Sequence, residues 1–149
     1  MSEMKEKISK SYAKLLNDKK SRNVSCCGDQ GESSCCGDQG EISFGCYYMD
    51  SELNHFLRPG MTVIDFGSGP GKDLLLSAEI IGPSGKAIGV DMTEEMIAEL
   101  HQNAEKRNLK NVTAVKSDIE TIPLDSDIAD VIISNCVINL ATDKQKVFE

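Results

Sequence analysis

Apolar residues are spaced differently in the two parts of this chain. From residue 61 onward, short apolar runs alternate with longer stretches in which apolar residues recur at helical spacing. In one such stretch Met96, Ile97 and Leu100 form an apolar face, and Thr93 precedes it as a natural N-cap. The pattern predicts strands over residues 62–66, 85–92, 111–118 and 129–135, helices over residues 72–82 and 93–109, and a helix that begins near residue 142.

The order of these predicted elements indicates the fold class. Strand, helix, strand, helix, strand and strand follow one another, which is typical of an α/β domain with a parallel sheet and covering helices. We therefore expect residues 51–149 to form such a domain.

The residues ahead of that domain have another character. Ile8 and Tyr12 share one helical face with Leu15 and Leu16, so a short amphipathic helix is predicted there. Residues 21–41 hold few large apolar side chains and cannot bury enough surface to fold alone. We expect residues 1–50 to comprise this helix and a flexible cysteine-rich segment.

Composition narrows the class of protein. The 149 residues carry a formal net charge of −8, which gives no general attraction to the phosphates of nucleic acid. The N-terminal residues lack the apolar core of a signal peptide, and no apolar run approaches the roughly 18 residues of a membrane span. We expect a cytoplasmic protein without nucleic-acid or membrane partners. In that reducing compartment, its six cysteines favour thiol chemistry or metal and metalloid binding over a disulfide scaffold.

The first predicted strand ends in a glycine-rich loop, DFGSGPG. Asp65, Gly67, Gly69 and Gly71 are spaced two apart, where a parallel sheet binds its ligands. A dinucleotide-binding loop would need a further glycine where this chain has Lys72, so the NAD alternative loses support. The D-x-G-x-G-x-G spacing resembles that of the class I S-adenosylmethionine methyltransferases.

This resemblance implies a cofactor and residues that hold it. Asp65 suits the positive end of S-adenosylmethionine, and Asp91 ends the second strand, where a carboxylate can accept both ribose hydroxyls. Met92 would cover the adenine, and Asp118 and Ile119 would read its amino group. For Asp118 alone, a role as a helix-capping aspartate is an equal alternative.

Longer motifs resemble a narrower family, the arsenite S-adenosylmethionine methyltransferases. They are VDMTEEMI, VIISNCVINL, SCCG and SFGC, and SNCVINL is the most specific of them. The resemblance implies that Cys46 and Cys136 are the catalytic cysteines, that they bind trivalent arsenic, and that Asn135 contacts the cofactor. Thiolates suit this soft metalloid, and catalysis would come mainly from positioning. Without the flanking motif, Cys136 would be read as a small buried hydrophobe.

A tandem repeat adds four thiols. SCCGDQGE occupies residues 25–32 and again residues 34–41, so the chain carries two adjacent-cysteine doublets. They are candidates to capture arsenic or its thiol conjugates, or to reduce a product by forming a disulfide, in which case a thiol reductant is a partner. Adjacent cysteines fit structural zinc poorly. The four cysteines are Cys26, Cys27, Cys35 and Cys36.

The fold class predicted from these features is a Rossmann-like class I methyltransferase fold that lacks its C-terminal strands. The family's sheet has seven strands, whereas this sequence predicts four. The apolar fourth strand would then have an unpaired edge, and we expect self-association through it. Three functions stay open: methylation of arsenite in arsenic detoxification, methylation of another small molecule, and non-catalytic binding of S-adenosylmethionine or arsenic.

Overall fold

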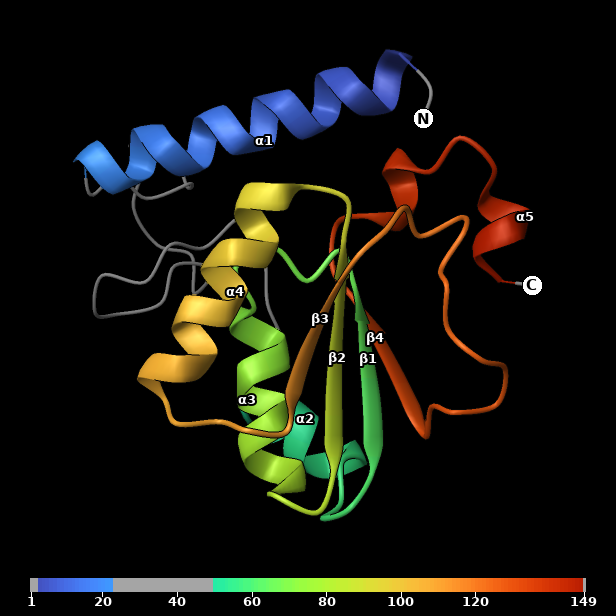
Figure 1. Cartoon of the computed structure of the whole chain (residues 1–149). Coiled ribbons are helices and arrows are strands. Elements are labelled where there is room, and N and C mark those ends of the chain that lie inside the picture. The colour runs from blue at the N-terminus through green and yellow to red at the C-terminus, as the bar shows by residue number, and fades with distance from the viewer. Residues whose placement is uncertain (1–2, 23–49, 149) are drawn as a thin grey trace.

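The computed structural model describes residues 3–22 and 50–148, and it places a parallel sheet beneath a long N-terminal helix (Figure 1). The four strands described are all parallel and lie in the order β3-β2-β1-β4. The elements in chain order are α1 (Glu3–Arg22), α2 (Asp50–Phe56), β1 (Thr62–Phe66), α3 (Lys72–Ile81), β2 (Lys86–Asp91), α4 (Glu94–Lys106), β3 (Val112–Lys116), β4 (Val131–Ser134), the 3-10 turn η1 (Ile138–Leu140) and α5 (Lys144–Val147).

The predicted α/β class, four strands and covering helices are confirmed. In register, Ile64 of β1 lies between Ile88 of β2 and Ile132 of β4. The chain runs from β1 outward to β3 and then returns to the other side of β1 for β4. This reversal places a topological switch point beside β1, where open parallel sheets bind ligands.

Two apolar layers stabilise the sheet. Helices α3 and α4 cover one face, as Figure 1 shows, and Leu74, Leu75 and Leu100 are buried in the core beneath them. The connection between β3 and β4 and the C-terminal residues cover the other face, where Ile119 and Val147 join the second core. Both faces of the central strands are therefore dry, which explains their continuous apolar runs.

Helix α4 begins where the sequence predicts. Thr93 occupies the N-cap position, but its side chain makes no capping hydrogen bond there. Its hydroxyl instead lies 3.4 Å from the hydroxyl of Ser9 on α1. Glu94 and Glu95 stand in the first turn, where negative charge is favourable to the helix dipole.

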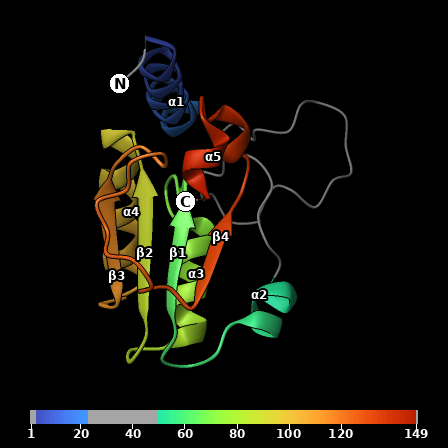
Figure 2. The same ribbon diagram turned by 90° about the vertical axis from the view of Figure 1, so that its right-hand side faces the viewer.

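Helix α1 lies across the carboxyl ends of the strands, and the quarter-turn view of Figure 2 shows the same placement. A helix is therefore confirmed here, but with 20 residues it is longer than the short helix predicted, and it contacts α4. Its length of 20 residues matches a membrane span, but its polar composition does not: within the described residues, no helix is long and apolar enough to cross a bilayer. Helix α2 and η1 were not predicted from the sequence.

Candidate functional site

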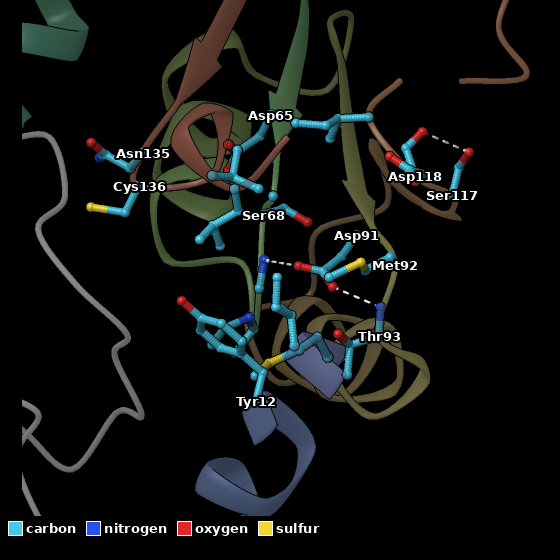
Figure 3. A pocket seen from close by; sticks show the side chains of 18 of the residues that line it. Tyr12, Asp65, Ser68, Asp91, Met92, Thr93, Ser117, Asp118, Asn135 and Cys136 are labelled. Carbon is cyan, nitrogen blue, oxygen red and sulfur yellow. Dashed lines mark hydrogen bonds between the residues drawn. The ribbon is translucent and has the colours of Figure 1, made fainter. Parts of the chain in front are cut away.

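The glycine loop after β1 and the end of β2 meet at a pocket above the sheet (Figure 3). The backbone N–H of Gly69 donates to Asp91 Oδ2 at 3.0 Å, and that of Thr93 donates to Asp91 Oδ1 at 2.8 Å. These two hydrogen bonds fix the Asp91 carboxylate at the carboxyl end of β2. Asp91 also lines the pocket, so its carboxylate lies beside any ligand that occupies it.

The glycines of the loop have different structural roles. Gly67 has a φ of +73°, and a Cβ there would lie 2.6 Å from the side chain of Val137. Gly69 lines the pocket, and a Cβ there would have no neighbour within 4 Å. Gly71, which the sequence analysis assigned to the cofactor, is buried and lies against Leu100 instead of lining the pocket.

Three carboxyl groups gather on the sheet side of the pocket, those of Asp65, Asp73 and Asp91. Burial raises the pKa of Asp65 well above its ordinary value, and the nearby charges of Asp73 and Asp91 raise it further. Burial also raises the pKa of Asp91, against the opposing effect of the hydrogen bonds that it accepts from Thr93, Gly69 and Met92. A cation that entered the pocket would relieve this repulsion, so the site favours a positively charged ligand.

The loop after β3 supplies a second acidic wall. Asp118 lines the pocket and Ile119 is buried beside it. Asp118 Oδ1 accepts from the backbone N–H of Glu120 at 3.0 Å, and Asp118 Oδ2 accepts from Lys5 Nζ at 2.5 Å. The Asp118 side chain is thus held by partners on two segments of the chain.

The segment after β4 carries the candidate substrate cysteine. Asn135 and Cys136 both line the pocket, on the opposite side of the view from Ser117 and Asp118 (Figure 3). Cys136 has an exposed free thiol and a φ of +57°, which is uncommon for a residue with a side chain. Its exposure contradicts the alternative that it is a small buried hydrophobe of the core.

The other five cysteines lie outside the described residues. They are Cys26, Cys27, Cys35, Cys36 and Cys46. The structure therefore does not test the convergence of Cys46 and Cys136 or the role of the doublets. Within residues 3–22 and 50–148, no group of three His, Cys, Asp or Glu side chains is arranged to hold a metal ion.

Several pocket residues were missed by the sequence analysis. Lys5, Ile8 and Tyr12 reach the pocket from α1, and Tyr12 points into it in Figure 3. The helical spacing of Ile8 and Tyr12 indicated that α1 has a surface to bury, but nothing in it indicated which part of the domain it would cover. Ser68 has a buried hydroxyl with no hydrogen-bond partner in the described structure.

The pocket suits S-adenosylmethionine on three counts. Its acidic groups match a ligand that carries a cationic sulfonium and a cationic amino group. The orphaned hydroxyl of Ser68 is a polar group that a ligand can satisfy. At Gly69 the backbone itself forms part of the lining, which lets a ligand approach closely.

Comparison with protein families decides the class of the domain. Residues 57–149 match the family described as methyltransferase domain. The chain belongs to this family. Its cofactor is accordingly S-adenosylmethionine, and the predicted class I architecture is confirmed. A similar solved structure is an S-adenosylmethionine-dependent methyltransferase from Aquifex aeolicus. It has 32% sequence identity and a TM-score of 0.62 over 66% of this chain and 53% of that one.

Among curated proteins, relatives of this methyltransferase domain include arsenite methyltransferases. That of Halobacterium salinarum is 46% identical over 93 residues, which is 62% of this chain and 24% of the relative. That of Aquipseudomonas alcaligenes is 33% identical over 97% of this chain and 45% of the relative. The chain thus spans less than half the length of these curated relatives.

Proposed function

We propose that this protein transfers a methyl group from S-adenosylmethionine to trivalent arsenic held by the thiolates of Cys136 and Cys46. The observation that carries the proposal is the exposed Cys136 thiol on the lining of the pocket, within the SNCVINL motif. The similarity to arsenite methyltransferases supports the choice of substrate. The activity would serve arsenic detoxification in the cytoplasm.

The residues of the pocket divide the binding of the cofactor between them. Asp91, held by Gly69 and Thr93, would accept hydrogen bonds from the ribose hydroxyls. Met92 would cover the adenine, while Asp118 and the backbone of Ile119 would read its edge. These roles leave the glycine loop as the surface against which the cofactor lies.

The charge of the pocket would orient the cofactor's positive end. Asp65 lies on the sheet side, next to Asp73, and a bound cation would stabilise the ionised form of its carboxyl. When bound, S-adenosylmethionine would supply a methyl group on a cationic sulfur: the lone pair of trivalent arsenic would donate to the methyl carbon, and the electron pair of the broken S–C bond would stay on the sulfur of the departing S-adenosylhomocysteine.

The cysteines would hold the substrate. Sulfur ligands select soft metalloids, and each thiol must lose its proton to bind as a thiolate. With Cys136 on the lining of the pocket, an arsenic bound to it lies beside the cofactor site, so positioning supplies most of the catalysis. The doublets at Cys26–Cys27 and Cys35–Cys36 would capture arsenic or its thiol conjugates, with a thiol reductant as partner.

The test is detection of methylated arsenic by mass spectrometry after incubation with arsenite, S-adenosylmethionine and a thiol reductant. Cys136→Ser keeps the shape of the side chain but replaces a soft donor by a hard one. We expect it to lose arsenite binding and product formation while it retains S-adenosylmethionine binding in calorimetry.

Matched variants locate the metalloid site. Cys46→Ser should resemble Cys136→Ser, whereas a variant with all four doublet cysteines replaced by serine should lower the rate at limiting arsenite and keep the inner site. If Cys136→Ser binds arsenite as tightly as the parent, the metalloid site is elsewhere. Binding of S-adenosylmethionine without binding of arsenite would indicate a methyltransferase for another small molecule.

A further inference from the structure

Helix α1 forms a wall of the cofactor pocket although it lies outside the sheet and its covering helices. It crosses the carboxyl ends of the strands (Figures 1 and 2), and Lys5, Ile8 and Tyr12 reach the pocket from it. Ser9, on the same helix, lies within 3.4 Å of the hydroxyl of Thr93. The docking of α1 therefore decides the shape of the pocket on this side.

One buried cation anchors the helix. Lys5 Nζ lies 2.5 Å from Asp118 Oδ2 and 2.7 Å from Glu120 Oε1, and its side chain is only 8% exposed. A lysine is rarely buried unless it is paired, since its charge loses water on burial. Here the two carboxylates replace that water.

The same two carboxylates also bind other segments of the chain. Asp118 is the residue expected to read the adenine, and its second oxygen accepts from the backbone of Glu120. Glu120 Oε1 also accepts from the backbone N–H groups of Thr142 at 2.6 Å and Asp143 at 3.1 Å. Lys5 thus joins α1, the loop after β3 and the segment after η1.

The ion pair between Lys5 and Glu120 shifts the pKa of both groups. The hydrogen bond from Lys5 is the main cause that lowers the pKa of Glu120, to about 2. Burial lowers the pKa of Lys5, but the hydrogen bonds and charges of Asp118 and Glu120 outweigh it, and the net shift is upward. Without Lys5, Asp118 and Glu120 would be two neighbouring negative charges without their shared cation, and the Asp118 carboxylate would keep only its hydrogen bond from the backbone of Glu120.

We propose that Lys5 is a positioning residue of the cofactor site: it orients the Asp118 carboxylate toward the adenine and holds Ile8 and Tyr12 as the outer wall of the pocket. This inference rests on the proposed function for the placement of the adenine. It assigns to the N-terminal helix a part in cofactor affinity, without contact between Lys5 and the reacting atoms.

The experiment compares Lys5→Met and Lys5→Arg in the full chain, with S-adenosylhomocysteine as the probe in calorimetry. Methionine keeps much of the length and loses the charge, so we expect affinity to fall about tenfold, since charge-assisted hydrogen bonds are the stronger class. Arginine should restore affinity to within about threefold of the parent. Lys10→Met is the matched control: Lys10 pairs with Glu6 on the exposed side of α1, and its side chain is 74% exposed.

Hydrogen exchange without ligand tests whether Lys5 anchors α1, separately from its effect on cofactor affinity. In Lys5→Met, the amides of α1 should exchange faster while those of β1 and β2 remain as slow as in the parent. Lys10→Met should leave α1 protected.

Each outcome bears on a different claim. If the parent chain does not bind S-adenosylhomocysteine, the proposed function fails. Independently of ligand binding, unchanged hydrogen exchange of α1 in Lys5→Met would overturn the claim that Lys5 anchors this helix. If the parent binds and Lys5→Met binds as tightly or more tightly, the positioning role is overturned. Should Lys5→Met fail to fold by circular dichroism, Tyr12→Ala tests the wall with the ion pair intact: equal affinity would contradict the proposal.

Discussion

The side-chain amide of Asn135 donates a 2.8 Å hydrogen bond to Asp73 Oδ2, which ties the end of β4 to the first turn of α3. Cys136 follows directly, with its backbone in the left-handed region at φ +57°. Such a conformation is retained only when the surroundings hold it. The bond between Asn135 and Asp73 is one of the contacts that hold this turn, and so it helps to set where the Cys136 thiol lies.

Replacing Asn135 by alanine should therefore destabilise the fold. A hydrogen bond to a charged group contributes roughly 1.5–3 kcal/mol, and this one is partly buried, so we expect the free energy of unfolding to fall by about 1–2 kcal/mol. Urea denaturation measures the change. Asn139→Ala, at an exposed asparagine four residues further on, is the control and should cost less than about 0.5 kcal/mol. Equal effects of the two substitutions would show that the bond to Asp73 contributes nothing specific.

Two glycines of the loop should respond differently to alanine. At Gly71, φ is +94° and a Cβ would lie 2.2 Å from Leu100 Cδ1, so strain and overpacking should together cost about 3 kcal/mol. At Gly69, φ is +53° but a Cβ would meet nothing within 4 Å, so only the backbone strain of about 1 kcal/mol should remain. Urea denaturation of the two variants tests this order, and a larger loss for Gly69→Ala would contradict it.

The two glycines should also differ in their effect on cofactor binding. Gly69 lines the pocket, so a methyl group there occupies space at the cofactor site. We expect Gly69→Ala to bind S-adenosylmethionine at least tenfold more weakly in calorimetry, although it is the more stable variant. Unchanged affinity would mean that the cofactor does not lie against this part of the loop.

The strands and their helices could be predicted because local pattern and tertiary role agree. Residues 62–66 form a short apolar run followed by glycines, and they are a buried central strand in the structure. The strand ends at Asp65, Asp91 and Asp118 line one pocket because parallel strands bring their carboxyl ends to one edge of the sheet.

The contribution of α1 could not be predicted. Its apolar spacing indicates a helix with a face to bury, but the contact between Lys5 and Asp118 joins residues 113 positions apart. No local pattern marks a surface lysine as one that a pair of carboxylates will bury. The hydrogen bond between Asn135 and Asp73 escaped prediction for the same reason, since it depends on how α3 is placed beside β4.

Asp65 should make stability depend on pH. Burial and the charges of Asp73 and Asp91 raise its pKa in the folded protein well above 3.8, the ordinary value. The folded protein therefore holds this proton more tightly than the unfolded chain, so the stability linked to it is present below pH 3.8 and is lost as pH rises through the folded pKa. Asp65→Asn removes the titration.

The measurement is the free energy of unfolding of the parent and of Asp65→Asn between pH 4 and about 8. We expect the stability of the parent to decline relative to the variant as pH increases. Asp125→Asn, at an exposed aspartate between β3 and β4, controls for the loss of one negative charge. A difference between parent and Asp65→Asn that stays constant with pH would contradict the raised pKa.

The two outer strands of the described sheet differ in the charge and exposure of the residues at their edges. Strand β3 carries Lys116 at its end, which pairs with Glu94 at the surface, and charge of this kind discourages pairing with another chain. Strand β4 has no charged residue between Val131 and Ser134, and its Ile132 is 55% exposed. Within residues 3–22 and 50–148, no strand pairs with the outer edge of β4, and an exposed apolar side chain lies on this strand.

We predict that the 149-residue chain self-associates through β4. Light scattering coupled to size-exclusion chromatography should show a mass that rises with protein concentration, because an apolar strand edge pairs with a second copy. Ile132→Lys places a charge on this strand and should shift the population toward monomer, whereas Thr113→Lys, at an exposed site on β3, should not. A parent chain that stays monomeric at high concentration would contradict the prediction. Equal effects of the two lysine substitutions would also contradict it, because the association would then depend on net charge and not on the edge of β4.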